Sequence, residues 1–151
     1  MTGTELNAVW ALKTRLDREK RRLQDLQVMA ESMTPLLDGM PHAKPLTFKV
    51  EKTAMLIVTC QEKIAELTDR LIQTKFDLLI NLQALNLNEM CERVLSYRYV
   101  ACLTFGAIAK LMNITRDYAW KIYKRGLASL GLTLDEMNAL KKATKGNNCS
   151  A

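Results

Sequence analysis

Apolar residues recur every seven residues in two long stretches of the first half of the chain. The first stretch runs from about Thr4 to Met33, and its repeating positions are Val9, Leu16, Leu23 and Ala30, with Leu12, Leu26 and Met33 in the partner positions of the repeat. This spacing predicts a helix with one narrow apolar seam along an otherwise charged surface.

The second stretch keeps the same period over about 35 residues. Its repeating positions are Val50, Ile57, Ile64, Leu71, Leu78 and Leu85. A helix of this length exceeds about 50 Å and is not stable in water unpaired, so it needs a partner. The first helix, folded back as an antiparallel hairpin or coiled coil, is the nearest one.

The second stretch also carries a further apolar stripe, made of Val58, Ala65, Ile72 and Leu79. A hairpin with the first helix leaves this stripe exposed, and exposed apolar stripes usually mark contacts. Two partners can cover it: a second copy of the chain, which would make a homodimer, or the C-terminal half of the same chain. The homodimer is the prediction.

Prolines and a glycine interrupt the helical pattern between the two stretches. Pro35, Gly39, Pro41 and Pro45 predict a break over residues 34–49. The chain is therefore predicted to be all-α, with a helical hairpin or coiled coil over residues 1–87. A DNA-binding domain over residues 88–144 and a disordered tail over residues 145–151 complete the prediction.

Residues typical of helix caps occur at several positions in the second half of the chain. Asn88, followed by Glu89 and Glu92, predicts the start of a helix. Thr104 and Thr115 predict two more helices, over residues 104–112 and 115–130, separated by a turn at Asn113 and Ile114. Thr133 and Glu136 form a capping box for a last short helix after Gly131. The pair at 104–130 has the helix-turn-helix pattern, whose second helix enters the DNA major groove.

The helix over residues 115–130 has two chemically different faces when projected at about 100° per residue. Ala119, Ile122, Gly126 and Leu130 fall on one side, which predicts a core face. The opposite arc of about 140° contains Asp117, Trp120, Lys121, Lys124 and Arg125. Basic side chains contact phosphates and guanines, and an aromatic ring packs on a thymine methyl, so this arc is typical of a recognition helix.

The segment ITRDYAWKIYKRGLASL resembles the last helix of region four of bacterial sigma factors, and LSYRYVACLTFGAIAKLMN resembles the helices before it. Upstream, GMPHAKPLTFKVEKTAMLIV is similar to a family of phage and mobile-element transcription regulators that end in such a domain. The resemblance spans about Met33 to Leu130. It implies a site-specific regulator of transcription that binds duplex DNA and contacts RNA polymerase.

The resemblance also implies roles for individual residues. Arg116, Asp117, Trp120 and Lys121 would be the positions that read bases and contact phosphates, and Arg125 would contact the backbone. The full predicted DNA-binding set is Arg116, Asp117, Tyr118, Trp120, Lys121, Lys124 and Arg125. The sigma pattern usually has Arg where Trp120 stands and Gln where Lys121 stands, so the sequence read differs from an ordinary sigma element. Gly126 stands where Ala is usual and costs about 1 kcal/mol of helix propensity.

Positive charge is concentrated in the second half. The net charge is +6, and residues 88–151 hold ten Lys and Arg against five Asp and Glu. A basic face of this kind fits nucleic acid, although it can also be merely solvated. A second basic run, Lys13 to Arg22, has Asp17 and Glu19 interleaved and is followed by Asp25. That alternation is more typical of a solvated helix face.

Residue patterns for catalysis or metal binding are weak. Cys60, Cys91, Cys102 and Cys149 have no paired short spacing, which argues against a zinc site, and His42 stands in a Pro-rich linker. Glu62 and Glu66 belong to a solvated helix face. We expect a cytoplasmic, non-enzymatic protein with no cofactor and no membrane span. The alternative function is an adaptor or inhibitor whose helix-turn-helix domain binds only proteins.

Overall fold

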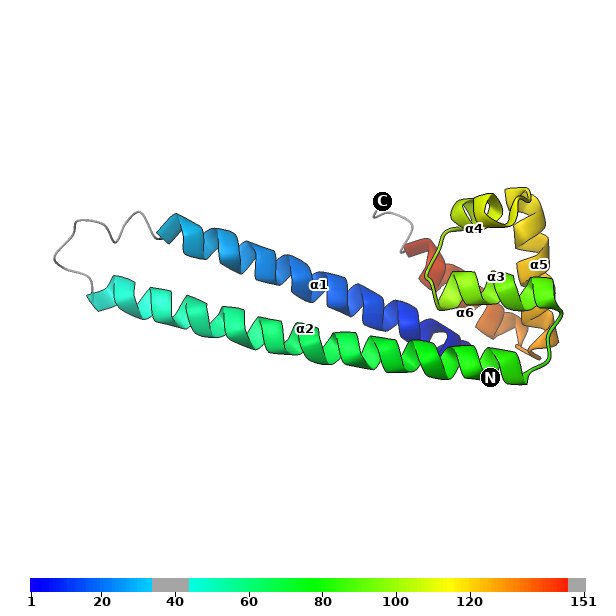
Figure 1. Cartoon of the computed structure of the whole chain (residues 1–151), viewed down its shortest axis with the longest axis horizontal. Helices are drawn as coiled ribbons and strands as arrows, with labels where there is room; N and C mark the ends of the chain where they lie inside the picture. The colour runs from blue at the N-terminus through cyan, green and yellow to red at the C-terminus, as the bar shows by residue number, and fades with distance from the viewer. Residues whose placement is uncertain (34–43, 147–151) are drawn as a thin grey trace. The chain divides into compact units, whose positions relative to one another are not determined.

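The computed structural model describes residues 1–33 and 44–146. This part of the chain is all-helical, which confirms the predicted fold class, and Figure 1 shows its six helices. They are α1 (Gly3–Met33), α2 (Lys44–Ala84), α3 (Glu89–Tyr99), α4 (Phe105–Met112), α5 (Arg116–Ser129) and α6 (Leu134–Gly146). Within the described ranges, none of these helices combines the length and apolar character needed to cross a membrane.

The described residues divide into two compact units, and both long helices contribute to each. One unit is Lys13–Arg70, and the other contains Met1–Leu12 together with the chain from Leu71 onward. The predicted division at residue 87 was drawn from the end of the heptad pattern and stays a prediction. Each unit has its own core.

The unit Lys13–Arg70 is built from antiparallel segments of α1 and α2 (Figure 1). Leu16 of α1 and Thr53, Cys60 and Leu67 of α2 are buried. These α2 positions repeat every seven residues but are offset from the predicted series, of which Ile57 and Ile64 are only half-buried. Both series together form the seam, as expected for alternating three- and four-residue spacing.

Cys60 of α2 meets Glu19 of α1 in this unit. The Cys60 thiol donates a hydrogen bond to the Glu19 backbone carbonyl at 3.4 Å and to its carboxylate Oε2 at 3.7 Å. Burial, aided by this carboxylate, raises the pKa of the thiol. Cys60 is therefore a small core residue between α1 and α2.

The start of α2 lies earlier than predicted. The break was expected over residues 34–49, but α2 begins at Lys44 and Pro45 lies in its first turn. Proline is tolerated there because the first backbone N–H groups of a helix have no intrahelical acceptor. Residues 34–43, which hold the rest of the predicted break and His42, lie outside the described residues.

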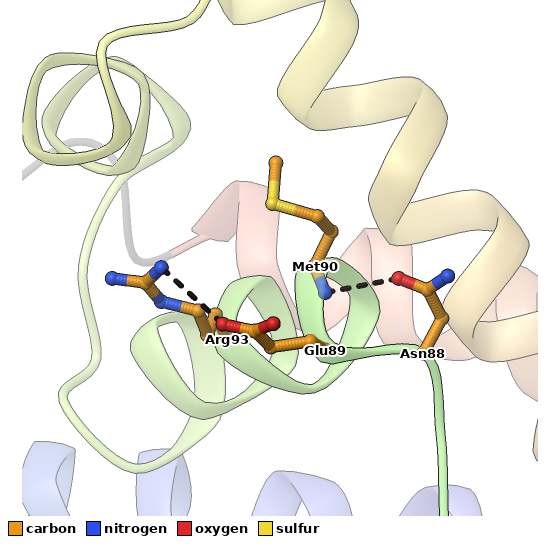
Figure 2. Close-up of polar contacts among 4 residues, drawn as sticks. All are labelled: Asn88, Glu89, Met90 and Arg93. Carbon is orange, nitrogen blue, oxygen red and sulfur yellow. Dashed lines mark hydrogen bonds and ion pairs between the residues drawn. The ribbon is translucent and has the colours of Figure 1, made fainter.

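Side-chain caps define the starts of helices in the unit that contains the chain from Leu71 onward, as predicted. The Asn88 side chain accepts a hydrogen bond from the Met90 N–H at 3.0 Å, and Figure 2 shows this cap beside the Glu89–Arg93 ion pair. Thr104 accepts from the Ala107 N–H and caps α4, at 3.3 Å. Each cap satisfies a backbone donor that the helix itself leaves unpaired.

The same cap begins α5, where Thr115 accepts from the Tyr118 N–H at 3.3 Å. The turn before it is made by Asn113, which adopts a left-handed conformation with φ of 53°. Gly131, with φ of 67°, follows the end of α5 as predicted. Thr133 and Glu136 form the predicted capping box, with the Thr133 N–H donating to the Glu136 carboxylate at 3.0 Å.

Helix α6 extends to Gly146, so the first two residues of the predicted tail are helical. The remaining tail, residues 147–151 with Cys149, lies outside the described part. The Glu136 carboxylate has its pKa lowered, chiefly by the hydrogen bond from the Thr133 backbone N–H.

Gly126 of α5 lies against Leu95 and Cys91 of α3. A Cβ added there would lie 3.0 Å from Leu95 Cδ1 and 3.4 Å from Cys91 Cβ. The sequence interpretation counted only the lost helix propensity at this position. The structure adds a reason for it: a methyl group would crowd the Leu95 side chain, which would have to shift.

We expect Gly126→Ala to destabilise the protein by about 1–3 kcal/mol, because an extra methyl would overpack the contact with Leu95. Gly106→Ala is the matched control, since a Cβ at this α4 position meets nothing within 4 Å. It should stabilise the protein by about 0.5–1 kcal/mol through helix propensity. Urea unfolding of both variants measures the two effects, and equal effects would contradict the close approach.

Candidate functional site

Helix α5 is held by one buried face, which its local sequence defines. Ala119, Ile122, Tyr123, Gly126 and Leu127 are all buried. The predicted core positions are thus confirmed for Ala119, Ile122 and Gly126, whereas Leu130 is half-buried after the helix end. The buried face lies against α3 and α4. The opposite face is left for solvent or a ligand.

An aromatic cluster, formed by Tyr99, Phe105, Trp120 and Tyr123, joins α5 to the other two helices. The Phe105 ring lies edge-on to both Trp120 and Tyr123, with centroids 5.1 Å apart in each pair. Trp120 stacks on Tyr123 at 5.3 Å. Such geometries add to the free energy gained by burial, by about 0.5–1.5 kcal/mol for each pair.

The two buried tyrosines are also joined by their hydroxyl groups. Tyr99 Oη and Tyr123 Oη lie 2.7 Å apart, a hydrogen bond between α3 and α5 in a dry environment. Burial raises the pKa of both tyrosines, because it disfavours the charged phenolate. The bond therefore satisfies two polar atoms that would otherwise be costly to bury.

Arg98 of α3 is a buried cation, with only 1% of its surface exposed. Its guanidinium lies over the rings of Trp10 and Phe105, at 4.9 Å and 4.8 Å from the centroids, and donates to the Leu103 carbonyl at 2.7 Å. Desolvation lowers the pKa of Arg98. Ring faces and a carbonyl thus stabilise this charge.

Trp10 connects the first turns of α1 to this core. Its indole N–H donates to the Arg98 backbone carbonyl at 3.1 Å. The sequence reading assigned the start of α1 to the hairpin and missed this contact. Trp10, Arg98 and Phe105 carry no periodic signal of their own. Of the three, only Arg98 had a local signal, since it stands between Tyr97 and Tyr99.

The seven predicted site residues divide into six exposed residues and one that is half-buried. The exposed ones lie along the outer face of α5: Arg116, Asp117, Tyr118, Lys121, Lys124 and Arg125. They carry four positive charges and one negative charge. Lys110, near the end of α4, is also exposed and was absent from the predicted set.

Trp120 departs from the solvent-facing position that the projection predicted. It lies at the edge of the outer arc, where Phe105 and Tyr123 partly cover its ring. The Lys124 ammonium lies 5.4 Å from the centre of the ring, a cation–π contact. Trp120 therefore supports the outer face and orients Lys124, and its removal also costs packing.

The exposed side of α3 carries a shallow hollow. Glu92, Arg93, Ser96 and Tyr97 line this hollow, which has a volume of about 150 Å³. In the part of the chain that the structure covers, His, Cys, Asp and Glu side chains form no cluster suited to a metal ion. The chemistry offered by α5 and α3 is therefore charge pairing and hydrogen bonding on open surfaces.

Comparison with known proteins adds no relative. No protein-family model matches the sequence, and no curated protein or solved structure is significantly similar to it. The resemblance to sigma region four thus stays a prediction from the residues quoted above.

The tyrosine pair predicts a loss of stability at alkaline pH. Because folding raises both pKa values above the unfolded value of about 10, the stabilisation is complete below pH 10. It is lost as the pH rises from there toward the folded pKa values, since the unfolded chain ionises first. Urea unfolding should show a free energy that falls above pH 10. Tyr99→Phe with Tyr123→Phe should flatten this fall, whereas Tyr118→Phe, on the exposed face, should leave it unchanged; equal curves for all three proteins would contradict the assignment.

Proposed function

We propose that the chain is a sequence-specific, DNA-binding regulator of transcription of the phage or mobile-element type. In this proposal α4 and α5 form a helix-turn-helix unit similar to sigma region four, and α5 is the recognition helix. One observation carries it: six of the seven predicted contact residues are exposed along α5, while its opposite face is buried. The function proposed is binding, with no catalytic step.

The dimensions of α5 fit this role. Its 14 residues span about 21 Å at 1.5 Å per residue, and the major groove, about 12 Å wide, admits a helix. Lys121 lies within the exposed arc. The three-residue connection from α4, with Asn113 in a left-handed conformation, is short enough to hold the two helices as one element.

Chemistry assigns a role to each exposed side chain. Arg116 and Lys121 are suited to guanine edges, and Asp117 to the amino group of cytosine. Tyr118, 48% exposed, is the aromatic residue best placed to meet a thymine methyl or a sugar. Lys124 and Arg125 are suited to phosphates. Trp120 acts in this scheme by positioning Lys124.

The exposed side of α3 offers a second surface for a protein partner. By its resemblance to region four, this helix would contact RNA polymerase, and the hollow lined by Glu92, Arg93, Ser96 and Tyr97 provides charged and polar groups for it. The adaptor alternative, binding proteins only, is favoured by one observation: Leu111 of α4 is 60% exposed and lies near the turn.

We also propose that the chain forms a homodimer through α2. Most exposed apolar residues of this helix lie within an arc of about 120°, and Leu56 projects outside it: the arc contains Phe48, Met55, Val58, Ala65, Ile72, Phe76 and Ile80. The buried positions, such as Cys60 and Leu78, project on the opposite side. A helix of 41 residues with two opposite apolar faces has one face left for a second copy, and the repeat suits helix pairing.

Lys121→Ala tests base reading by α5. Against a selected duplex it should cost about 1–3 kcal/mol and relax preference at the contacted base pair. Lys124→Ala should instead weaken specific and non-specific duplexes about equally and lower the salt slope by about 0.9. Lys142→Ala, an exposed charge-matched control on α6, should change neither. Fluorescence-anisotropy titration measures all three, and wild-type protein that binds no duplex at low salt would favour the adaptor.

Val58→Glu with Ile72→Glu tests the homodimer. Charges placed in the exposed stripe should dissociate the dimer while leaving helix content unchanged, because neither side chain belongs to the buried seam. Gln27→Glu with Asn81→Asp adds the same charge at exposed positions outside the stripe. Sedimentation at micromolar concentration reads the outcome, and a monomeric wild type would rule out the dimer.

A further inference from the structure

A second strongly basic face lies on α1, in the unit Lys13–Arg70. Residues 13–22 hold six basic and two acidic residues, a net charge of +4 over ten positions. Arg15, Arg18 and Arg22 are exposed and project within an arc of about 60° at 100° per residue. The arginines therefore form a row along one side of the helix, spanning about 10 Å.

The acidic residues of this segment do not neutralise the row. Interleaved charges predicted a solvated face, yet Glu19 turns toward α2, where its carboxylate accepts from the Cys60 thiol. Asp17 projects to another side of α1, and Asp25 lies at the edge of the row. The ion pairs Arg70–Glu66 and Arg93–Glu89 involve none of the three arginines of the row.

Lys63 extends this positive face onto α2. Lys63 and Arg22 border the same small hollow above Cys60, which Glu19 also lines; the two cations act to lower the pKa of the thiol, and Glu19 acts to raise it. The hollow itself is too small for a ligand, with a volume of about 20 Å³. The hollow matters because it shows that Lys63, a fourth cation, lies beside Arg22 of the arginine row.

We propose that Arg15, Arg18 and Arg22, with Lys63, form a second contact to duplex DNA that binds its phosphate backbone without reading sequence. This inference rests on the proposed function, which supplies the duplex. Guanidinium groups pair with phosphate through two parallel hydrogen bonds, and a duplex presents one negative charge per about 1.7 Å of its axis. The row thus faces several phosphates at once.

The chemistry of the face favours a nucleic-acid backbone over other anionic partners. A membrane-bound helix needs apolar side chains beside its basic ones, but Leu16 of this segment is buried in the hairpin. Protein interfaces centre on aromatic or large apolar anchors, and residues 13–22 expose none. Positive charge is therefore the main feature that this face offers a partner, and charge dominates the affinity of proteins for phosphate backbones.

The test compares two charge-matched variants of the full chain. Arg18→Gln with Arg22→Gln removes two charges from the row, and Lys49→Gln with Lys52→Gln removes two exposed charges from α2 in the same unit. Anisotropy titrations over a range of salt should give the arginine variant a slope lower by about 1.8, or 0.9 for each phosphate. Specific and random duplexes should weaken by the same factor. The lysine variant should match wild type, and both should keep the wild-type melting temperature.

Any other result would contradict a specific part of the proposal. An unchanged slope for the arginine variant, or an equal loss in the lysine control, would overturn the second contact. Loss of binding on Lys121→Ala with no effect of the arginine pair would overturn this inference alone and leave the proposed function standing. Wild-type protein that binds no duplex would overturn both, and tighter arginine-dependent binding to single-stranded RNA than to duplex DNA would show that the partner is wrong.

Discussion

Tyr123 sets the rotation of α5 about its own axis, and the candidate surface depends on that rotation. Its hydroxyl bonds to Tyr99, and its ring lies against Phe105 and Trp120. Because successive helical residues are about 100° apart, fixing one buried residue fixes the direction of all the others. Lys121 and Tyr118 therefore point outward as a consequence of how Tyr123 points inward.

Arg98 and Trp10 extend the same core beyond the three helices of the second half. A buried guanidinium would normally require a carboxylate, because an unpaired charge is costly to desolvate. Here two aromatic faces and the Leu103 carbonyl surround it, and one of those faces comes from the first turns of α1. The start of the chain is thus part of the unit that carries the candidate surface.

In both α1 and α2, one face of the helix is buried in a core and another face is exposed. The buried side of α2 supplies a core position in each unit, Cys60 in one and Leu78 in the other, while its opposite side exposes Val58 and Ile72. The arginine row of α1 lies beside a seam that buries Leu16. In both helices the residues left over from core formation are the ones available for partners, which explains why the binding proposals concern helix faces rather than cavities.

Local rules in the sequence determined the helices, their caps and the all-helical class. Asn88, Thr104, Thr115 and the Thr133–Glu136 pair act within one turn, so their effect is readable without the rest of the molecule. The same locality explains the buried face of α5 at Ala119 and Ile122.

Tertiary structure decided what depends on residues distant in the chain. Trp120 is partly covered because Phe105 lies over the edge of its arc, and space at Gly126 is tight because Leu95 lies 3.0 Å from where a Cβ would stand. Arg98 is buried because Trp10, 88 residues earlier, packs against it. Periodicity describes one helix at a time, whereas these positions are set by which helix packs against which, and that is determined only when the whole chain folds.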